Sequence, residues 1–541
     1  MLHATRPSSI ADRPGVRVAS LAEPLRNRAA SDPDRLAIVD GRVELTYRQL
    51  DARSAALARA LCERGVGRGD VVTMQLPNWW EAAVVYQATM LLGCVLNPIV
   101  PIYRAREMSF IERQCRPRAV VVPHVFRGFD HLAMQQQLTL ELDEAPLVVV
   151  VRPDGDDVPD GAIAFDELDG SAGELPTGVG PDDICLLLYT SGTTADPKGV
   201  LHSHRTIAYE VDSIIELCRL GMDDHIFMAS PVTHITGYLY GLVMPAVTGA
   251  AAILQDVWDP HRAADLIEAR GCRFSVGATP FLHGLVEEYA RRGAPSALQT
   301  FLCGGADVPP PLVRTASRQL DALVTRVYGS SEFPTATCGR LDDPFEITAD
   351  TDGVPIGPVA CRLDNADGAG VGELLVRGPD LFLGYLDASL NVEAFTDDGY
   401  FRTGDLASIA PSGAVTIRGR HKDIIVRGGE NISAKEVEDV LFGHPAVSEV
   451  AVVAMPDPVM VERSCAFVVP KPGAVISLVT LTAFLDEHHF ARQKYPERVE
   501  IVSELPKTAS GKVQKFVLRE QIIKQLAAEI PAASSNSSAE A

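Results

Sequence analysis

The most restrictive feature of this sequence is an apolar run that leads into a short loop rich in hydroxyl groups. Ile184 to Leu188 are continuously apolar, which predicts a buried strand. The loop that follows, Thr190 to Lys198, contains hydroxyl side chains, small residues and one lysine. Small residues let backbone N–H groups approach an anion closely, while hydroxyls and a lysine add donors and charge. This chemistry predicts a cradle for a triphosphate.

The order of residues distinguishes this loop from a Walker A loop. That motif reads G-x-x-x-x-G-K-[ST], whereas here Lys198 precedes Gly199. The alternative interpretation is a polar surface loop after a strand, and the density of phosphate-binding residue types weighs against it. These residues are Thr190, Ser191, Gly192, Thr193, Thr194 and Lys198.

Length and composition limit the class of protein. A chain of 541 residues exceeds what one hydrophobic core supports, so we expect two or more domains. The net charge of −22 argues against a nucleic-acid or anionic-membrane partner. The ten cysteines form no C-x-x-C pair, which favours free buried thiols in a reducing cytoplasm over a zinc site or a disulfide framework.

Two long uncharged stretches, Gly237 to Leu254 and Val84 to Ile102, are interrupted by prolines and are interpreted as core segments rather than membrane spans. The first twenty residues contain no apolar segment of a secretory signal. We therefore expect a soluble, cytoplasmic protein. The sequence leaves the oligomeric state open, with a homodimer as one candidate.

The first half of the chain alternates strand and helix patterns, which favours α/β layers with parallel strands. Val71 to Leu76 is typical of a strand and Trp79 to Leu92 of a helix. The segment from Phe126 to Pro181 has weaker periodicity and many Asp, Gly and Pro residues, so we expect a peripheral connection there. A helix is predicted over Ile207 to Leu220.

Three later strands end in small, hydroxylated or charged residues, at Phe274–Pro280, Phe301–Ala306 and Val324–Glu332. Ligands in parallel sheets collect beyond the carboxyl ends of strands, so we expect a crevice there. His234 lies alone between hydroxyl residues on an apolar background. A lone histidine is more often a satisfied core residue than a functional one, and from the pattern alone a structural role is favoured.

Near Gly372 the pattern changes to short strands separated by turns, and beyond Gly419 a smaller α+β unit is predicted, with a helix over Ala434 to Leu441. Residues 530–541 are rich in Ala, Ser and Asn and are predicted to be disordered.

Taken together, these segments resemble the adenylate-forming superfamily of acyl-CoA synthetases, luciferases and nonribosomal-peptide adenylation domains. The resemblance extends from about Leu45 to Lys512 and includes, in family order, the hydroxyl-rich loop, His234, Tyr328–Glu332, Thr403–Asp405, Gly419–Arg420 and Lys512. It implies a large N-terminal domain of layered α/β subdomains and a small mobile α+β lid. The implied boundaries are a flexible N-terminus at 1–20, an AMP-binding domain at 21–420, a hinge at 420–422 centred on Lys422, a lid at 421–529 and a tail at 530–541.

The resemblance also implies two half-reactions that use ATP, Mg²⁺ and CoA. A carboxylate attacks the α-phosphate of ATP and releases pyrophosphate, and a thiol then attacks the acyl-adenylate. The first step concentrates negative charge on phosphate oxygens, which positioned donors and magnesium stabilise.

Roles for single residues follow from the same resemblance. The implied catalytic residues are Lys512, Glu332, Lys198 and His234, with Glu332 as the Mg²⁺ ligand. The implied ATP-binding residues are Thr190, Ser191, Gly192, Thr193, Thr194, Lys198, Gly304, Gly305, Ala306, Tyr328, Gly329, Ser330, Ser331, Asp405, Arg420 and Lys512. The implied acyl pocket comprises His234, Val276, Gly277, Thr279 and Gly304, and the CoA tunnel Gly428 and Gly429. For Lys512, an ordinary solvated lysine is the weaker alternative.

Two positions depart from the family pattern. Ala195 stands where glycine is usual, and alanine would be strained if that position requires positive φ. Ser331 replaces the commoner threonine and keeps the hydroxyl. Neither change removes a reactive group, so we expect an active enzyme.

Three functions compete at this stage. The leading hypothesis is a carboxylate–CoA ligase, the second an adenylation enzyme that loads a carrier protein or another acceptor, and the third a nucleotide-binding regulator without catalysis. Against the second, no carrier segment follows Lys512. Against the third, the implied reactive residues are all present.

The acid is expected to be apolar, with an uncharged tail that is cyclic or of short to medium length. Val232–Tyr240 and Val276–Leu282 contain no Asp, Glu, Lys or Arg. An amino acid would leave its ammonium unpaired there, at a high cost in free energy. The segments around His234 and Tyr328 are most similar to cyclohexanecarboxylate–CoA ligases, but fatty acyl ligases share them.

Overall fold

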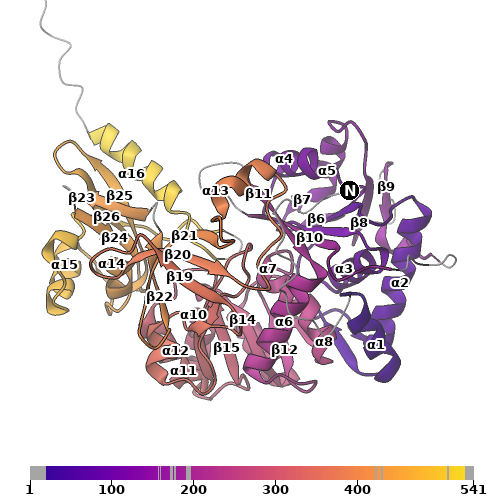
Figure 1. Ribbon diagram of the computed structural model, residues 1–541, viewed down its shortest axis with the longest axis horizontal. Helices are drawn as coiled ribbons and strands as arrows, with labels where there is room; N and C mark the ends of the chain where they lie inside the picture. Colours follow the sequence, from indigo (N-terminus) through magenta and orange to yellow (C-terminus); the bar gives the residue numbers. More distant parts are fainter. Residues whose placement is uncertain are drawn as a thin grey trace, which may run out of the picture.

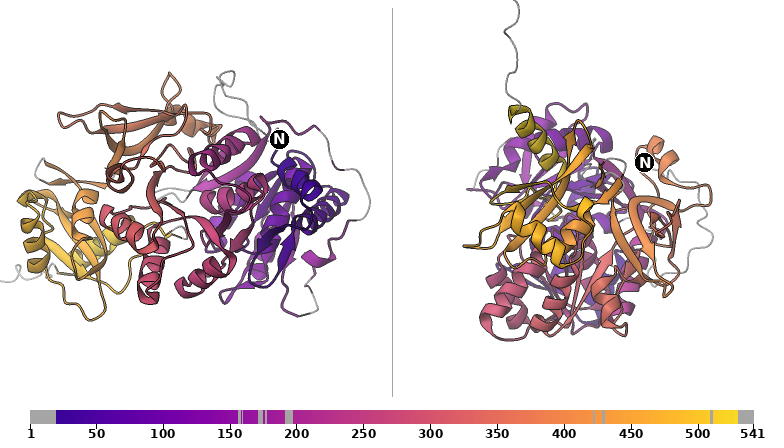
Figure 2. Two further views of the ribbon diagram at one scale, coloured as in Figure 1. Left: turned by 90° about the horizontal axis from the view of Figure 1, so that it is seen from below. Right: turned by 90° about the vertical axis from the view of Figure 1, so that its left-hand side faces the viewer.

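The computed structural model describes residues 20–529, apart from 156–157, 159, 171–174, 176–177, 191–196, 421–422, 428–429 and 509–510. Figures 1 and 2 show a large body of α/β layers, with a smaller unit at the C-terminal end of the chain. The predicted mixed α/β class is therefore confirmed. The predicted tail at 530–541 and residues 1–19 of the N-terminus lie outside the described residues.

The larger sheet has a parallel centre with antiparallel strands at both edges. In spatial order its strands are β18 (Val354–Pro355), β17 (Thr337–Cys338), β16 (Leu323–Tyr328), β15 (Thr300–Gly304), β14 (Cys272–Gly277), β12 (His225–Met228), β13 (Ala252–Leu254), β1 (Leu36–Val39) and β2 (Glu44–Thr46). Strands β14, β15 and β16 lie side by side and parallel. Their carboxyl ends therefore meet at one edge, as the sequence predicts.

The second sheet carries the hydroxyl-rich loop. In spatial order its strands are β11 (Lys198–Ser203), β10 (Ile184–Thr190), β4 (Val95–Pro98), β3 (Val71–Met74), β5 (Ala119–Pro123), β8 (Leu147–Val151) and β9 (Ala162–Ala164). The expectation of a peripheral connection over Phe126–Pro181 is wrong, because β8 pairs with β5 along its whole length and is almost completely buried. A small hairpin, β6 (Val125–Phe126) and β7 (Phe129–Asp130), precedes it.

Helices fill the space between the two sheets and cover their outer faces (Figure 1). Every residue of α3 (Trp80–Leu92) is buried, because this apolar helix shares one core cluster with side chains of both sheets. A left-handed glycine, Gly93, ends it. The other helices of this body are α1 (Glu23–Ser31), α2 (Tyr47–Glu63), α4 (Ala105–Cys115), α5 (His131–Thr139), α6 (His204–Cys218), α7 (Ile235–Gly237), α8 (Met244–Thr248), α9 (Pro260–Arg270), α10 (Thr279–Arg292), α11 (Pro310–Leu320) and α12 (Phe345–Asp350).

An antiparallel sheet follows, in the order β19 (Ala360–Asp364), β20 (Gly372–Arg377), β21 (Phe401–Ile409) and β22 (Val415–Arg420), with the short helix α13 (Asn391–Ala394) between β20 and β21. The smaller unit, here called the lid, contains β24 (Glu430–Ser433), β23 (Ile424–Arg427), β26 (Val461–Pro470), β25 (Val447–Asp457), β27 (Arg498–Ile501), α14 (Ala434–Leu441), α15 (Leu478–Glu487) and α16 (Lys515–Glu529). It has its own apolar clusters on both faces of its sheet.

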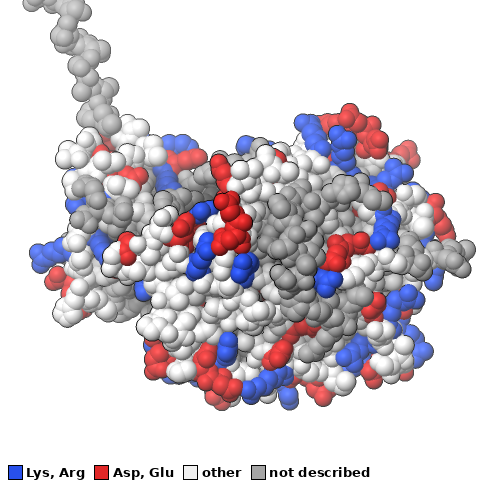
Figure 3. All heavy atoms as spheres, in the orientation of Figure 1, with Lys and Arg blue, Asp and Glu red and all other residues white. Residues whose placement is uncertain are grey.

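None of the helices described in the structure is long and apolar enough to cross a membrane. On the face shown in Figure 3, acidic and basic side chains are interspersed over the visible surface.

Candidate active site

Strands β10 and β11, which flank the hydroxyl-rich loop, form a β-hairpin. Strands β10 and β11 are antiparallel, and Thr190 lies directly opposite Lys198. The sequence analysis missed β11, which begins at the lysine. Four of the predicted phosphate-binding residues, Ser191, Gly192, Thr193 and Thr194, lie outside the described residues, as does Ala195.

Tyr385 connects the hairpin to the predicted magnesium ligand. Its hydroxyl donates a hydrogen bond to Glu332 Oε1 at 2.8 Å, and the amine of Lys198 lies 5.1 Å from the centroid of its ring. Burial, and then the charge of Glu332, raise the pKa of Tyr385 well above its ordinary value, so the hydroxyl stays protonated and donates. Lys198 and Glu332 therefore contact the same side chain, which the sequence analysis did not single out.

His202, on β11, holds the segment that precedes Glu332. Its Nε2 lies 2.7 Å from the carbonyl oxygen of Ser331, and its Nδ1 lies 3.0 Å from Thr206 Oγ1. Because a carbonyl only accepts, Nε2 carries the proton in this arrangement. The hairpin and the Ser331–Glu332 turn are thus fixed to one another.

Residues 328–336 form a tight turn that requires glycine at Gly329. A Cβ atom there would lie 1.9 Å from the carbonyl oxygen of Pro334. Ser330 N–H donates to the Phe333 carbonyl at 2.8 Å, which closes the turn. Gly304 meets a similar restriction at the end of β15, since its Cβ would lie 2.3 Å from the carbonyl oxygen of Val327. The strand ends therefore approach more closely than side chains would allow.

The predicted ribose-binding pair is already assembled. Arg420 Nε lies 3.0 Å from Asp405 Oδ1, and the two residues are cross-strand partners on β22 and β21. The hydroxyl of Tyr328 donates to the other oxygen, Asp405 Oδ2, at 2.7 Å. Burial, then the Asp405 charge, raise the pKa of Tyr328 well above its ordinary value. Both Asp405 oxygens are therefore engaged by side chains from the edge of the crevice.

Lys512 approaches this crevice from the lid. A turn holds its backbone: Lys512 N–H donates to Thr508 Oγ1 at 3.1 Å, and Thr508 N–H donates to the Lys512 carbonyl at 2.8 Å. A Cβ added to Gly511, which has φ +84°, would lie 3.2 Å from Pro280 on α10. Burial, and then the positive charge of Lys512, lower the pKa of His234 to about 4. The imidazole is therefore neutral near pH 7.

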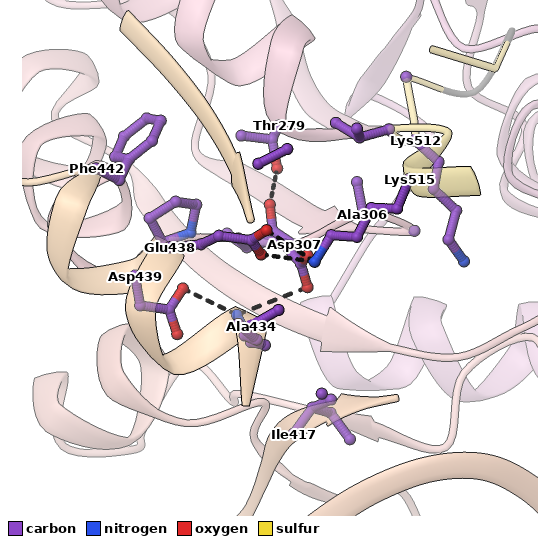
Figure 4. Close-up of a pocket in the computed structure, with 18 of the residues that line it drawn as sticks. Thr279, Ala306, Asp307, Ile417, Ala434, Glu438, Asp439, Phe442, Lys512 and Lys515 are labelled. Atoms are coloured by element: carbon purple, nitrogen blue, oxygen red, sulfur yellow. Dashed lines mark hydrogen bonds and ion pairs between the residues drawn. The ribbon is translucent and has the colours of Figure 1, made fainter. Parts of the chain in front are cut away.

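A cavity of about 340 Å³ lies between the lid and the large body. Figure 4 shows Glu438 and Asp439 at the left of it and Lys512 and Lys515 at the right, with Thr279 and Asp307 between them. Several predicted site residues line it together: Thr279, Gly305, Ala306, Tyr328, Gly329, Asp405, Arg420 and Lys512.

The remaining predicted acyl-pocket residues lie at the end of β14. Val276 is almost completely buried, and its carbonyl accepts a hydrogen bond from Ser230 at 3.3 Å. A Cβ on Gly277 would lie 3.2 Å from Phe281. The predicted hinge residue Lys422 and the predicted tunnel residues Gly428 and Gly429 lie outside the described residues.

Magnesium fits this site as an ion held by one carboxylate and by phosphate oxygens. Within the described ranges, no group of three or more His, Cys, Asp or Glu side chains is placed to hold a metal. Mg²⁺ is usually bound through one or two carboxylates together with substrate phosphates and water. Glu332, fixed by Tyr385 beside the hairpin, meets that requirement.

Known proteins are similar to this chain in sequence and in fold over nearly its whole length. The profile of the AMP-binding enzyme family matches residues 25–386, and that of the AMP-binding enzyme C-terminal domain matches residues 436–512. The medium-chain fatty-acid–CoA ligase of Escherichia coli K12 is 34% identical over 523 residues, covering 95% of this chain and 92% of that protein. The 2,3-dihydroxybenzoate-AMP ligase of Bacillus subtilis is 33% identical over 517 residues, covering 93% and 94%.

A solved structure of a known protein has the same fold. ATP-bound MatB from Rhodopseudomonas palustris superimposes with a TM-score of 0.82 at 28% identity, covering 93% of this chain and 98% of that one. The predicted relationship to the adenylate-forming superfamily is therefore confirmed. The chain belongs to the AMP-binding enzyme family and is an adenylate-forming ligase.

Proposed function

We propose that this enzyme activates an apolar carboxylic acid with ATP and transfers the acyl group to CoA. In the first half-reaction a carboxylate oxygen forms a bond to the α-phosphorus of ATP, and the bond from that phosphorus to the bridging oxygen of pyrophosphate breaks. In the second, the CoA sulfur bonds to the acyl carbon and AMP leaves, while the thiol proton passes to solvent. We propose a lid over residues 421–529 and an AMP-binding domain over 21–420.

Charged and hydroxyl side chains of this chain stabilise the first transition state. We assign the β- and γ-phosphates to the hairpin turn and Lys198, and the α-phosphate to Ser331. Magnesium bound at Glu332 would offset phosphate charge. Lys512 is assigned the bridge between the attacking carboxylate and the α-phosphate, because donors aimed at developing charge contribute most to such reactions.

Nucleotide recognition is assigned to the crevice edge. We propose that Gly304, Gly305, Ala306 and Tyr328 frame the adenine. Asp405 and Arg420 bind the ribose hydroxyls, and Gly329 with Ser330 complete the phosphate turn. The existing Asp405–Arg420 contact supports this role, since it holds both groups at one position before ATP arrives.

We propose that the acid is neutral apart from its carboxylate. The segments that hold His234 and Val276 carry no charged residue, and His234 itself is neutral near pH 7 because its pKa is about 4. A substrate ammonium would find no counter-charge there, so amino acids are poor substrates. Cyclic or short- to medium-chain acids are favoured, in keeping with the named substrate of the E. coli relative.

A carrier protein is the alternative acceptor, because one relative is named as an AMP ligase rather than a CoA ligase. A cytoplasmic location is part of the proposal and is supported by the ten free cysteines. A homodimer remains the candidate oligomeric state, which sedimentation would measure.

The observation that carries the proposal is that Lys512, from the lid, lines the same cavity as Tyr328, Asp405 and Arg420 of the large body. Acid-dependent exchange of labelled pyrophosphate into ATP tests it, because exchange reports adenylation alone. We expect exchange with cyclohexanecarboxylate or octanoate and none without acid. Acid-dependent exchange without acyl-CoA formation would favour the carrier alternative, and ATP binding without exchange would support a regulator.

A further inference from the structure

The first helix of the lid, α14, contacts the large body at both of its ends. Lys435 lies in its first turn and is only 4% exposed. Phe442, which follows its last turn, packs against an apolar core cluster of the large body, and its ring centroid lies 6.4 Å from that of His283 on α10. Figure 4 shows Phe442, Glu438 and Asp439 projecting from this helix beside Thr279 and Asp307.

At the first of these contacts, Lys435 lies between carboxylates of both units. Its amine is 2.9 Å from Asp439 Oδ1 on the same helix and 3.7 Å from Asp307 Oδ1 on the large body. Asp307 is itself held in place, because its carbonyl accepts a hydrogen bond from Thr279 Oγ1 at 2.5 Å. One lysine therefore joins the lid to the segment that follows β15.

The local charge balance favours this contact. Burial alone would raise the pKa of Asp307, but the charges of Lys435, Lys515, Lys512 and Arg420 lower it to about 2. Asp307 is consequently ionised throughout the physiological range. It is also the carboxylate of the large body that faces Lys435, whose amine loses nearly all contact with water when the lid is seated.

The loss of solvent around Lys435 explains why a second carboxylate matters. Removing an ammonium from water is costly unless anions replace the water. Asp439 lies on the same helix as Lys435, so it offsets part of this desolvation cost wherever the lid lies. Asp307 offsets more of it only when α14 rests on the large body, so this carboxylate favours the seated position over an open one.

We propose that Asp307 and Lys435, together with Phe442, form a seat that holds the lid where Lys512 reaches the crevice, and that they are positioning residues for adenylation. Acid activation, the role given to Lys512, rests on the proposed function above. The seat concerns only the position of the lid on the large body. The two claims are therefore tested separately.

Hydrogen–deuterium exchange of the full chain without ligand tests the seat directly. Asp307→Asn and Lys435→Gln should each raise amide exchange in both α10 and α14, because an unseated α14 also withdraws Phe442 from α10. Phe442→Ala should do the same through the other end of α14. Glu436→Gln is the matched control: it removes a charge from the same helix, whose partner Lys494 at 2.7 Å belongs to the lid, and should leave α10 exchange unchanged.

The half-reactions test the functional consequence. Because Asp307 is half exposed, its pairing has the strength of a surface ion pair, and each polar substitution should slow adenylation by about two- to fivefold. Thioester formation from preformed acyl-adenylate should be unchanged, since we propose that the hinged lid takes another position for that step. The double variant, Asp307→Asn with Lys435→Gln, should have an adenylation rate only slightly lower than that of Lys435→Gln alone, because both substitutions remove the same contact.

Exchange that rises only in α14, or in neither helix, would overturn the seat, because Lys435 would then act within the lid alone. An equal loss in both half-reactions would overturn the positioning role. If amide exchange rises in α10 and α14 of the seat variants but the enzyme turns over no acid, the seat is supported and the proposed function is contradicted.

Discussion

At the scale of single residues, the account depends most on Lys512, which lines the cavity together with Asp405 and Arg420 of the large body. Lys512→Ala should lower the adenylation rate about a hundred- to a thousandfold, because losing one donor to transition-state charge costs about 2.7–4 kcal/mol. Thioester formation from chemically prepared acyl-adenylate should survive far better. Single-turnover measurements of each half-reaction separate the two effects, and an equal loss in both would contradict this division of labour.

Tyr385 is predicted to position Glu332 for magnesium. Tyr385→Phe keeps the ring beside Lys198 and removes only the hydrogen bond to the carboxylate, a bond to a charged group worth about 1.5–3 kcal/mol. The Mg²⁺ concentration for half-maximal adenylation should rise about tenfold or more. Tyr400→Phe, where the ring lies against Arg362 and Arg377, is the control. Unchanged Mg²⁺ dependence in Tyr385→Phe would exclude this role.

Sequence reasoning proposed which residues carry the reactive groups, but it did not single out the residues that contact them. Lys198, Glu332 and Asp405 stand in recognisable local motifs. Tyr385 and His202 contact that machinery only because distant segments of the chain come together in the fold. No local pattern marks a tyrosine or a histidine for such a contact, so the structure was needed to find them.

At the scale of elements, the connection between the large body and the lid is predicted to act as a hinge at Lys422. The residues that flank it belong to different units: Arg420 pairs with Asp405, whereas Asp423 pairs with Arg519 at 2.8 Å. Lys422→Pro restricts the backbone between these anchors and should slow transfer to CoA about tenfold or more, while adenylation persists. Lys422→Ala is the control. Normal steady-state turnover of the proline variant would refute the hinge.

The elements that sequence patterns predicted were clear apolar runs, such as α3 and β14–β16, and the amphipathic helix α14. Strand β11 was missed because it begins with Lys198 and carries the buried, polar His202. Strand β8 was missed because the segments around it are rich in Asp, Gly and Pro, although four of its five residues are buried. In both cases pairing with a neighbouring strand decided the structure.

At the scale of the whole molecule, a buried carboxyl group should make stability depend on pH. Burial raises the pKa of Glu112 to about 7, although a hydrogen bond from Gln135 at 3.0 Å lowers it in part. The native state then binds more protons than the unfolded state between about pH 4.5 and 7, so stability falls as pH rises through that window. Each pKa unit corresponds to about 1.4 kcal/mol.

Glu112→Gln removes this titration, so its Tm should fall less between pH 5 and pH 8 than that of the unaltered enzyme. Thermal unfolding at both values measures the difference. Glu63→Gln, an exposed carboxylate on α2, is the control and should follow the unaltered enzyme. Parallel curves for Glu112→Gln and the unaltered enzyme would show that Glu112 does not bind a proton in this range.

The most direct test of the whole account is CoA-dependent release of AMP with a panel of acids. The panel is cyclohexanecarboxylate, benzoate, octanoate, palmitate and phenylalanine, each with ATP, Mg²⁺ and CoA. We predict that cyclohexanecarboxylate or octanoate gives the highest kcat/KM and that phenylalanine gives the lowest. Preference for palmitate would contradict only the size of the acid, whereas preference for phenylalanine, or AMP release that does not require CoA, would contradict the central claim.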